Sequence, residues 1–395
     1  MILDNKQQAE EELENADLNL GIDPDEDESI IQPFDPELIR VETRPMSIDL
    51  LLQRIKYEEL NLTPDFQRKD GIWNNRTKSR LIESILIRIP LPAFYMDATD
   101  EDRWVVIDGL QRLTTLKMFV INKENTENSK CEDTDKPLKL SELEFLTQLN
   151  DKTFDELPRN FQRRITETQV TVYLIEKGTP AAVKFNIFKR INTGGLPLSL
   201  QEIRHALNIG KSTELLKRLA NSTKFKQATA YRNFNQRMTD REFILRFLAF
   251  VIHPYTEYKA TEFDSFLSDV MAKINDMSEQ EINNLELKFD QAMTAAYQIF
   301  GNDAFRKRSR PDAPRSPINK ALFESWSVNL SKLDREQLQT LIDRRDQLKE
   351  GFIRLMNDRE VDPKFDASIS VGTGDTRKVK RRFGAIEQLI QEVLA

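Results

Sequence analysis

The sequence predicts a mixed α/β (α+β) fold, in which a small mixed sheet with helices is followed by a mostly helical domain. Two observations lead to this prediction. Short runs of alternating apolar residues, typical of strands, lie between residues 93 and 176. After residue 200, apolar residues recur at helical spacing almost to the end of the chain. With 395 residues, 39% of them hydrophobic, the chain is long enough to bury more than one core.

Charge marks the first boundary. Residues 1–38 hold thirteen acidic residues and one lysine, a net charge of −12, which leaves +5 for the rest of a chain whose total is −7. Such a segment is typical of an acidic disordered tail, although it could also lie across a basic groove. We therefore expect a tail over 1–38, an α/β domain over 40–200 with a polar insertion near 123–160, and a helical domain over 201–395.

The elements of the α/β domain follow from apolar spacing and helix-end signals. Ser47 is a suitable N-cap for the first helix, and Pro90 and Pro92 end the second. In chain order we expect a helix over 47–60, a loop over 61–73, a helix over 75–89, strands over 93–97, 103–107 and 168–176, and a helix over 179–191.

The helical domain begins with a capping box, in which Ser199 is followed three residues later by Glu202. The apolar spacing then predicts helices over 212–219, 240–251, 261–277, 279–300, 333–357 and 384–394.

Scarce histidine and cysteine exclude several classes of site. His205 and His253 are the only histidines, too few and too far apart for an HNH nuclease centre, an HD phosphohydrolase or an H-x-x-H metalloprotease. Cys131 is the only cysteine, so an intrachain disulfide and a cysteine-based zinc cluster are excluded. A single cysteine fits a reducing compartment. The sequence also shows no basic signal-peptide start and no long apolar run, so we expect a cytoplasmic protein without membrane contact.

The most informative motif is the turn at residues 107–116, Ile-Asp-Gly-Leu-Gln-Arg-Leu-Thr-Thr-Leu. A β-prone run precedes it and helical spacing follows, so Asp108 and Gly109 should lie where a strand passes into a helix. The first turn of a helix has unpaired backbone N–H groups that attract phosphate, and glycine permits close approach to the main chain. Arg112 adds a cation, and Gln111 adds an amide.

Similar groups occur at two other turns. They are Gln67 and Arg68 in the first loop, and Arg190 with Asn192, Thr193, Gly194 and Gly195 after the last helix of the α/β domain. Lys78 lies on the polar face of the helix after the first loop. Each motif alone also fits a C-cap, a tight turn or a solvated cation. Together they predict one polyphosphate site, at which Asp108 would hold a hydrated Mg²⁺ or orient a water.

The same segments resemble the successive motifs of the N-terminal domain of GmrSD-type restriction endonucleases, a family that includes SspE-related defence proteins. The motifs are Pro-Asp-Phe-Gln-Arg at 64–68, Ser-Arg-Leu-Ile-Glu-Ser-Ile-Leu at 79–86, Ile-Pro-Leu-Pro at 89–92, the turn at 107–113 and Phe-Lys-Arg-Ile-Asn-Thr-Gly-Gly at 188–195. Weaker similarity continues to about residue 390. The resemblance implies a ParB/sulfiredoxin-like small mixed sheet.

It also implies a nucleoside triphosphate site that uses Mg²⁺. The family signature at the turn is Asp-Gly-Gln-Gln-Arg, and this chain has Leu110 where the first Gln is expected. By resemblance, Asp108, Gln111 and Arg112 are the catalytic residues, with Asp108 as the metal ligand. Nucleotide-binding residues would be Gln67, Arg68, Lys78, Gly109, Arg190, Asn192, Thr193, Gly194 and Gly195.

Family members often continue into an HNH nuclease domain, which this sequence lacks. The resemblance therefore implies a nucleotide-binding and hydrolysing switch module of a DNA-restriction or phage-defence system that acts with a separate effector protein. DNA is a further expected partner, through the basic clusters of Arg306, Lys307 and Arg308 and of Lys380, Arg381 and Arg382. A homo-oligomer is left open.

Two other functions remain open at this stage. One is a DNA-binding adaptor with a degenerate nucleotide pocket. The other is a metal-dependent nuclease in which Asp108 with Glu83 or Asp65 binds the metal, although no paired-carboxylate spacing supports it.

Overall fold

The computed structural model describes residues 40–62, 73–121, 137–191, 199–230, 236–259, 262–357 and 364–395. Its contacts divide the chain into two compact units, one over Phe34–Leu196 and one that contains Pro197–Ala395. The first unit holds a small mixed sheet and the second is helical, so the predicted mixed α/β class is confirmed. Predictions for the tail over 1–38, for Asp65, Gln67 and Arg68, and for Asn192, Thr193, Gly194 and Gly195 fall outside the described residues.

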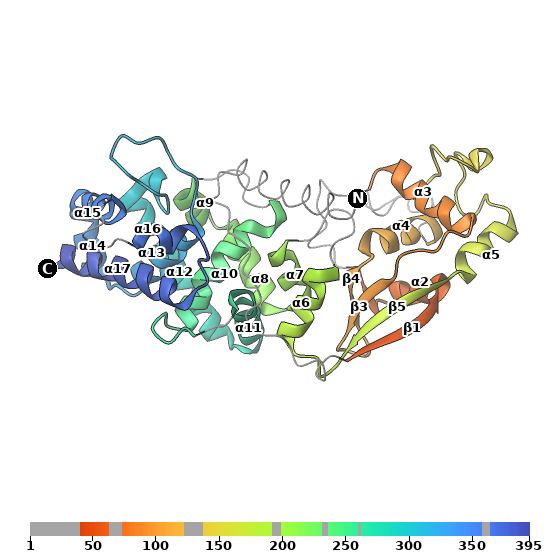
Figure 1. Cartoon of the computed structure of the whole chain (residues 1–395), viewed down its shortest axis with the longest axis horizontal. Helices are drawn as coiled ribbons and strands as arrows, with labels where there is room; N and C mark the ends of the chain where they lie inside the picture. The colour runs from red at the N-terminus through yellow and green to blue at the C-terminus, as the bar shows by residue number, and fades with distance from the viewer. Residues whose placement is uncertain are drawn as a thin grey trace. The chain divides into compact units, whose positions relative to one another are not determined.

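The first unit alternates strands and helices (Figure 1). Its elements are β1 Val41–Ser47, α2 Ile48–Lys56, β2 Leu60–Asn61, α3 Asn75–Leu86, β3 Phe94–Ala98, β4 Trp104–Asp108, α4 Leu110–Val120, the 3₁₀ turn η4 Thr147–Leu149, α5 Arg159–Glu167, β5 Gln169–Glu176 and α6 Ala181–Ile191.

The five strands form one sheet in the order β1-β5-β3-β4-β2. β5 pairs antiparallel with β1 and parallel with β3, whereas β4 pairs antiparallel with β3 and parallel with β2. The sequence pattern did not predict the two edge strands. β1 contains Pro45, which an edge strand tolerates because one side of it makes no ladder, and β2 has only two residues.

The two faces of the sheet differ. Phe94, Met96 and Val106 are buried on one face, in a core with side chains from α2, α3, α4 and α5. Alternate residues lie on the other face, where Lys184 of α6 bonds Asp97 of β3 at 3.1 Å. Helix α6 also contacts β4. The sheet is therefore covered by helices on its core face and, along the row of Asp97, by α6.

Residues 137–158 have little regular structure, but they are part of the core rather than a purely polar insertion. Five buried leucines from this segment pack against the sheet: Leu138, Leu140, Leu143, Leu149 and Leu157. Isolated leucines in a polar run give no periodic signal, which is why the sequence pattern missed their burial.

The second unit packs its helices around one extensive hydrophobic core. Its elements are α7 Leu200–Leu207, α8 Lys211–Asn221, α9 Thr223–Thr229, η5 Gln236–Met238, α10 Thr239–Ile252, α11 Phe263–Asp276, α12 Glu279–Phe300, η6 Gly301–Asp303, α13 Lys320–Ser331, α14 Arg335–Asp343, α15 Arg345–Asn357, α16 Phe365–Ser370 and α17 Thr376–Leu394. No helix among the described residues is both long enough and apolar enough to cross a membrane.

Candidate functional site

The last residue of β4 is redirected by a β-bulge. Met96 of β3 faces Val106 of β4, but the next residue back, Tyr95, faces Asp108, so β4 has one extra residue here. Without the bulge, alternation would send Asp108 toward the core with Val106. With it, Asp108 shares a pair with Tyr95, and its side chain stays 32% exposed. The bulge thus brings a carboxylate to the partly exposed end of the strand.

Gly109 makes the sharp turn from β4 into α4. Its φ of 98° lies in the left-handed region, which disfavours residues with a Cβ. A Cβ at this position would also collide with the ring of Phe94. The first α-helical bond of α4 runs from Leu113 N to Gly109 O, at 2.9 Å. The N–H groups of the residues between them have no acceptor within the helix, and they form an anion-attracting first turn next to Asp108.

Arg112 holds this turn together. Its guanidinium donates to Asp108 Oδ2 at 2.8 Å, to Ala93 O at 3.1 Å and to Pro92 O. It also lies over the Phe94 ring, 4.4 Å from its centroid. The side chain of Arg112 is only 10% exposed. Before any ligand binds, Arg112 therefore orients Asp108 and ties α4 to the residues that lead into β3.

Burial sets the electrostatics of this pair. Burial raises the pKa of Asp108 above its ordinary value, although Arg112 and the Gly109 N–H partly offset the rise. Burial likewise lowers the pKa of Arg112, and Asp108 partly restores it. Because arginine titrates far above neutrality, the guanidinium stays charged. Among the described residues, Arg112 is the cation that pairs with this partly buried carboxylate, which would gain from a further positive charge nearby.

These residues fit a Mg²⁺ that arrives with a nucleotide. Mg²⁺ keeps several waters and binds through one or two carboxylates plus phosphate oxygens, so Asp108 alone suffices on the protein side. A protein-only metal site needs more ligands. Among the described residues, no group of three or more His, Cys, Asp or Glu side chains could hold a metal ion.

The other predicted nucleotide-binding residues are only partly within the described structure. Gln111 lies in the first turn of α4 and is partly exposed. Arg190 belongs to the last turn of α6. Lys78 of α3 is buried, and its Nζ lies 3.6 Å from Met118 Sδ of α4, so it belongs to the interface between these two helices rather than to an open loop.

Glu83 has a structural role, which corrects its candidacy as a metal ligand. Its carboxylate accepts backbone N–H bonds from Glu144, Phe145 and Leu146 at 2.7–3.0 Å. Burial alone would raise the pKa of Glu83, but the three N–H groups together with Arg80 lower it below its ordinary value. Its oxygens thus anchor the 137–158 segment to α3, and the nuclease alternative loses this ligand.

The candidate DNA-binding cations divide into buried and exposed groups. Arg306 is buried and donates to Ser316 O and Thr229 O at 2.6 and 3.1 Å. Arg382 is fully buried and bonds Glu324. The structure thus places these two arginines in the interior, where their guanidinium groups serve the fold and cannot contact a DNA backbone.

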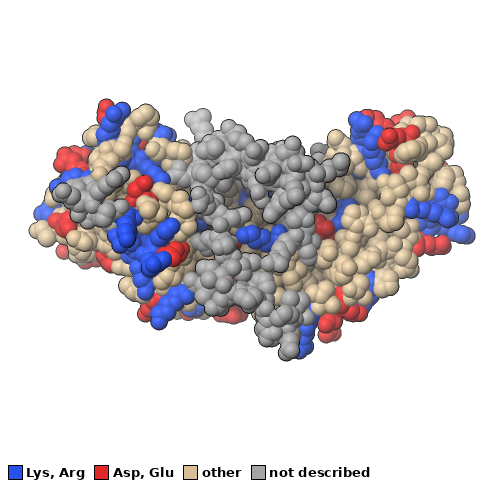
Figure 2. Space-filling model, viewed as in Figure 1, with Lys and Arg blue, Asp and Glu red and all other residues tan. Residues whose placement is uncertain are grey.

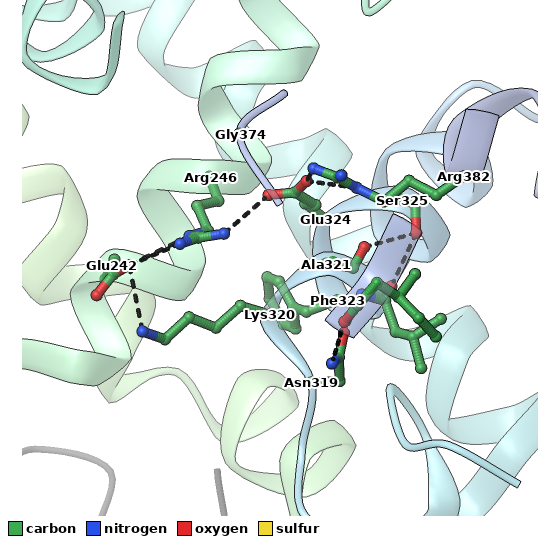
Figure 3. Close-up of polar contacts among 12 residues, drawn as sticks. Glu242, Arg246, Asn319, Lys320, Ala321, Phe323, Glu324, Ser325, Gly374 and Arg382 are labelled. Carbon is green, nitrogen blue, oxygen red and sulfur yellow. Dashed lines mark hydrogen bonds and ion pairs between the residues drawn. The ribbon is translucent and has the colours of Figure 1, made fainter. Parts of the chain in front are cut away.

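Figure 3 shows that Arg382 belongs to a chain of buried ion pairs. Glu324 pairs with Arg382 and, at 3.6 Å, with Arg246. Glu242 pairs with Arg246 at 3.1 Å and with Lys320 at 3.4 Å. The chain links α10, α13 and α17 through the centre of the helical unit. Side chains that look like surface charges in the sequence are thus structural.

The remaining basic residues lie closer to the surface. Lys307 donates to Ser370 Oγ at 2.9 Å, and Arg308 pairs with Asp303 at 3.0 Å. Lys380 is partly exposed and Arg381 is exposed on α17. On the face seen in Figure 2, basic and acidic residues are interspersed in the described regions rather than separated into large fields of one sign.

The sequence patterns missed two tyrosines beside the turn. Tyr95 of β3 and Tyr173 of β5 stack, with ring centroids 4.8 Å apart and planes 18° from parallel. Both rings lie on the sheet face opposite the core, although an alternating pattern predicts only polar residues there. The sequence signal that could have found this pair is the presence of tyrosines at outward-facing strand positions.

One comparison with known proteins is informative. Residues 48–209 match the family model described as the GmrSD restriction endonuclease, N-terminal domain. No curated protein matches the chain.

Proposed function

Residues 48–209 form a GmrSD-type N-terminal domain, which links the chain to restriction and phage-defence systems, and on this premise we propose that it is a nucleoside-triphosphate-binding and hydrolysing switch module. The observation that carries this proposal is the bulged turn. It sets the Asp108 carboxylate beside the open N–H groups at the start of α4. A triphosphate supplies what this turn attracts, because it offers anionic oxygens to the amides and a phosphate-bound Mg²⁺ to the carboxylate.

Each residue of the turn has a distinct role in this proposal. The N–H groups in the first turn of α4 hold phosphate oxygens. Asp108 binds the hydrated Mg²⁺, which would neutralise developing charge, or orients the attacking water. Gln111, partly exposed in the first turn of α4, would orient the same water. Arg112 fixes Asp108 through its 2.8 Å bond, and a phosphate contact by Arg112 would require it to exchange a carbonyl partner.

The neighbouring elements support a site at this edge of the sheet. β2 runs parallel to β4, so the chain leaves Asn61 toward the edge where β4 ends at Asp108. The first turns of α6 are fixed by the bond of Lys184 to Asp97, and α6 contacts β4. A helix that returns along the sheet from this point leads Arg190 to the same edge. The described ends of β2 and α6 thus lead toward the edge where β4 ends.

In this proposal the chain acts with a separate effector protein in a restriction or phage-defence system. Nucleotide binding would change the contacts that the helical unit makes with effector or DNA. For DNA, the candidate contacts are the basic residues that remain at least partly exposed, Lys307 near α16 and Lys380 and Arg381 on α17.

Calorimetric titration of the full chain with each ribonucleoside triphosphate and Mg²⁺ tests the proposal. Wild-type protein should bind the triphosphate and slowly hydrolyse it, which releases inorganic phosphate. Asp108→Asn should abolish phosphate release, because it removes the carboxylate charge. Asp102→Asn, in the exposed turn of the same hairpin, should behave as wild type. If wild-type protein binds DNA but no triphosphate, the adaptor alternative is favoured. If Asp108→Asn still binds the triphosphate and still releases phosphate, the assigned roles are overturned.

A further inference from the structure

Three neighbouring strands present one row of side chains that ends at the proposed phosphate site. Tyr173 of β5 faces Tyr95 of β3, and Tyr95 faces Asp108 of β4. Directly opposed residues in a sheet lie on the same face, with Cβ atoms about 5 Å apart. All three side chains are partly exposed. The tyrosine pair is thus one strand spacing from the carboxylate.

The Tyr95 ring is partly exposed, and one of its faces carries Tyr173. Tyr173 stacks on it at 4.8 Å from the β5 side. Side chains stand roughly perpendicular to a sheet, so the second ring face of Tyr95 is directed toward β4 and Asp108. An aromatic ring backed by a second ring is a suitable stacking surface.

The next row along the sheet limits where a ligand fits. Asp97 lies two residues beyond Tyr95 on the same face, and Lys184 of α6 covers it through bonds of 3.1 and 3.2 Å. The side chains of Asp97 and Lys184 are only 13% and 11% exposed. The partly exposed part of this face therefore begins at the tyrosine row and continues toward Asp108.

From this arrangement we infer that Tyr95, supported by Tyr173, is the stacking platform for the base of the bound nucleotide, an inference that rests on the proposed function. When the phosphates lie at the first turn of α4, the base extends back over β4 toward Tyr95 of β3, and β3 lies about one strand spacing from β4. No other aromatic pair among the described residues of this sheet face lies beside the turn. The platform contacts the face of a base and not its hydrogen-bonding edges, so it would accept all four bases with similar affinity.

The test compares nucleoside triphosphates with inorganic tripolyphosphate, which carries the phosphates without a base. Tyr95→Leu should weaken triphosphate binding about tenfold, the loss typical of one stacked base. It should leave tripolyphosphate binding unchanged, because the turn at Gly109 is intact. Tyr95→Phe keeps the ring and should bind within about twofold of wild type. Wild-type affinities for the four triphosphates should differ by less than about tenfold.

A second readout is independent of affinity. The fluorescence of 2-aminopurine riboside triphosphate falls when its base stacks, so quenching should accompany binding to wild type and Tyr95→Phe and be reduced in Tyr173→Leu, which removes the supporting ring. Equal losses for triphosphate and tripolyphosphate in Tyr95→Leu, or unchanged quenching in both leucine variants, would overturn the platform. Wild-type protein that binds no triphosphate would instead overturn the proposed function itself.

Discussion

Gly109 is required for two separable reasons, its backbone conformation and its packing. Gly109→Ala places a side chain at φ 98° and drives a methyl group into Phe94. Gly178 is a matched control, since it has φ 101° but only contacts of 3.7 Å around an added Cβ. We expect Gly178→Ala to lower the free energy of unfolding by about 1 kcal/mol from backbone strain alone. Gly109→Ala should lose a further ~1–3 kcal/mol from overpacking. Urea denaturation measures both, and equal losses would contradict the packing argument.

Asp240, in the first turn of α10, gives a pH-dependent prediction. Burial raises its pKa to about 6, although the backbone N–H and charge of Arg241 partly offset the rise. Because the folded-state pKa is above the ordinary 3.8, the stabilisation belongs to the protonated form and is lost as pH rises through about 6. Asp240→Asn stays neutral. It should therefore exceed wild type in stability by on the order of 2 kcal/mol at pH 8 and match it near pH 4.

Chemical denaturation of both proteins across this pH range measures the difference. A gain that is the same at every pH would show that ionisation of Asp240 is not the cause.

The residues of the turn could be identified from sequence because a strand signal, a glycine and a helix signal follow one another without a gap. Their arrangement could not. The bulge that redirects Asp108 depends on the pairing of β3 with β4, and the role of Arg112 depends on carbonyl groups of Pro92 and Ala93, which lie 20 and 19 residues earlier. Tyr95 was missed because its partner Tyr173 is distant in sequence.

At the scale of elements, the buried ion pairs that link α10, α13 and α17 should dominate the stability of the helical unit. Arg382→Met removes one of the two arginines that pair with the buried Glu324 carboxylate. We expect a loss of about 3–5 kcal/mol in the free energy of unfolding. The adjacent Arg381 is exposed, so Arg381→Met should change stability by less than about 0.5 kcal/mol. Similar small losses in both variants, measured by denaturant unfolding, would contradict a structural role for the network.

Several elements with a clear amphipathic pattern were predicted well, whereas α5, which buries a single residue, and α13 were not predicted. Helix α3 begins at Asn75 as expected, with the side chain of Asn74 capping Thr77 N at 2.8 Å. Helix α13 was missed because its polar residues are as buried as its apolar ones, so no exposed face marks it in the sequence. The predicted helix over 333–357 is divided at Arg344 into α14 and α15.

At the scale of the whole molecule, the two units divide the proposed work. The unit over Phe34–Leu196 contains the bulged turn, the tyrosine row and most of the matched family segment. The helical unit contains the partly exposed or exposed basic residues Lys307, Lys380 and Arg381. Fold class followed from the distribution of strand and helix patterns along the chain, whereas the sorting of basic residues into buried and exposed groups needed the structure.

The central claim is that a nucleoside triphosphate binds at the turn from β4 into α4, and amide hydrogen exchange tests it most directly. The N–H groups of Leu110, Gln111 and Arg112 have no acceptor within α4, so in the free protein they should exchange fast. Saturating triphosphate with Mg²⁺ should slow exchange in a peptide that spans residues 107–116, and Asp108→Asn should reduce this protection. Unchanged exchange in this peptide, with protection confined to other parts of the chain, would contradict the account.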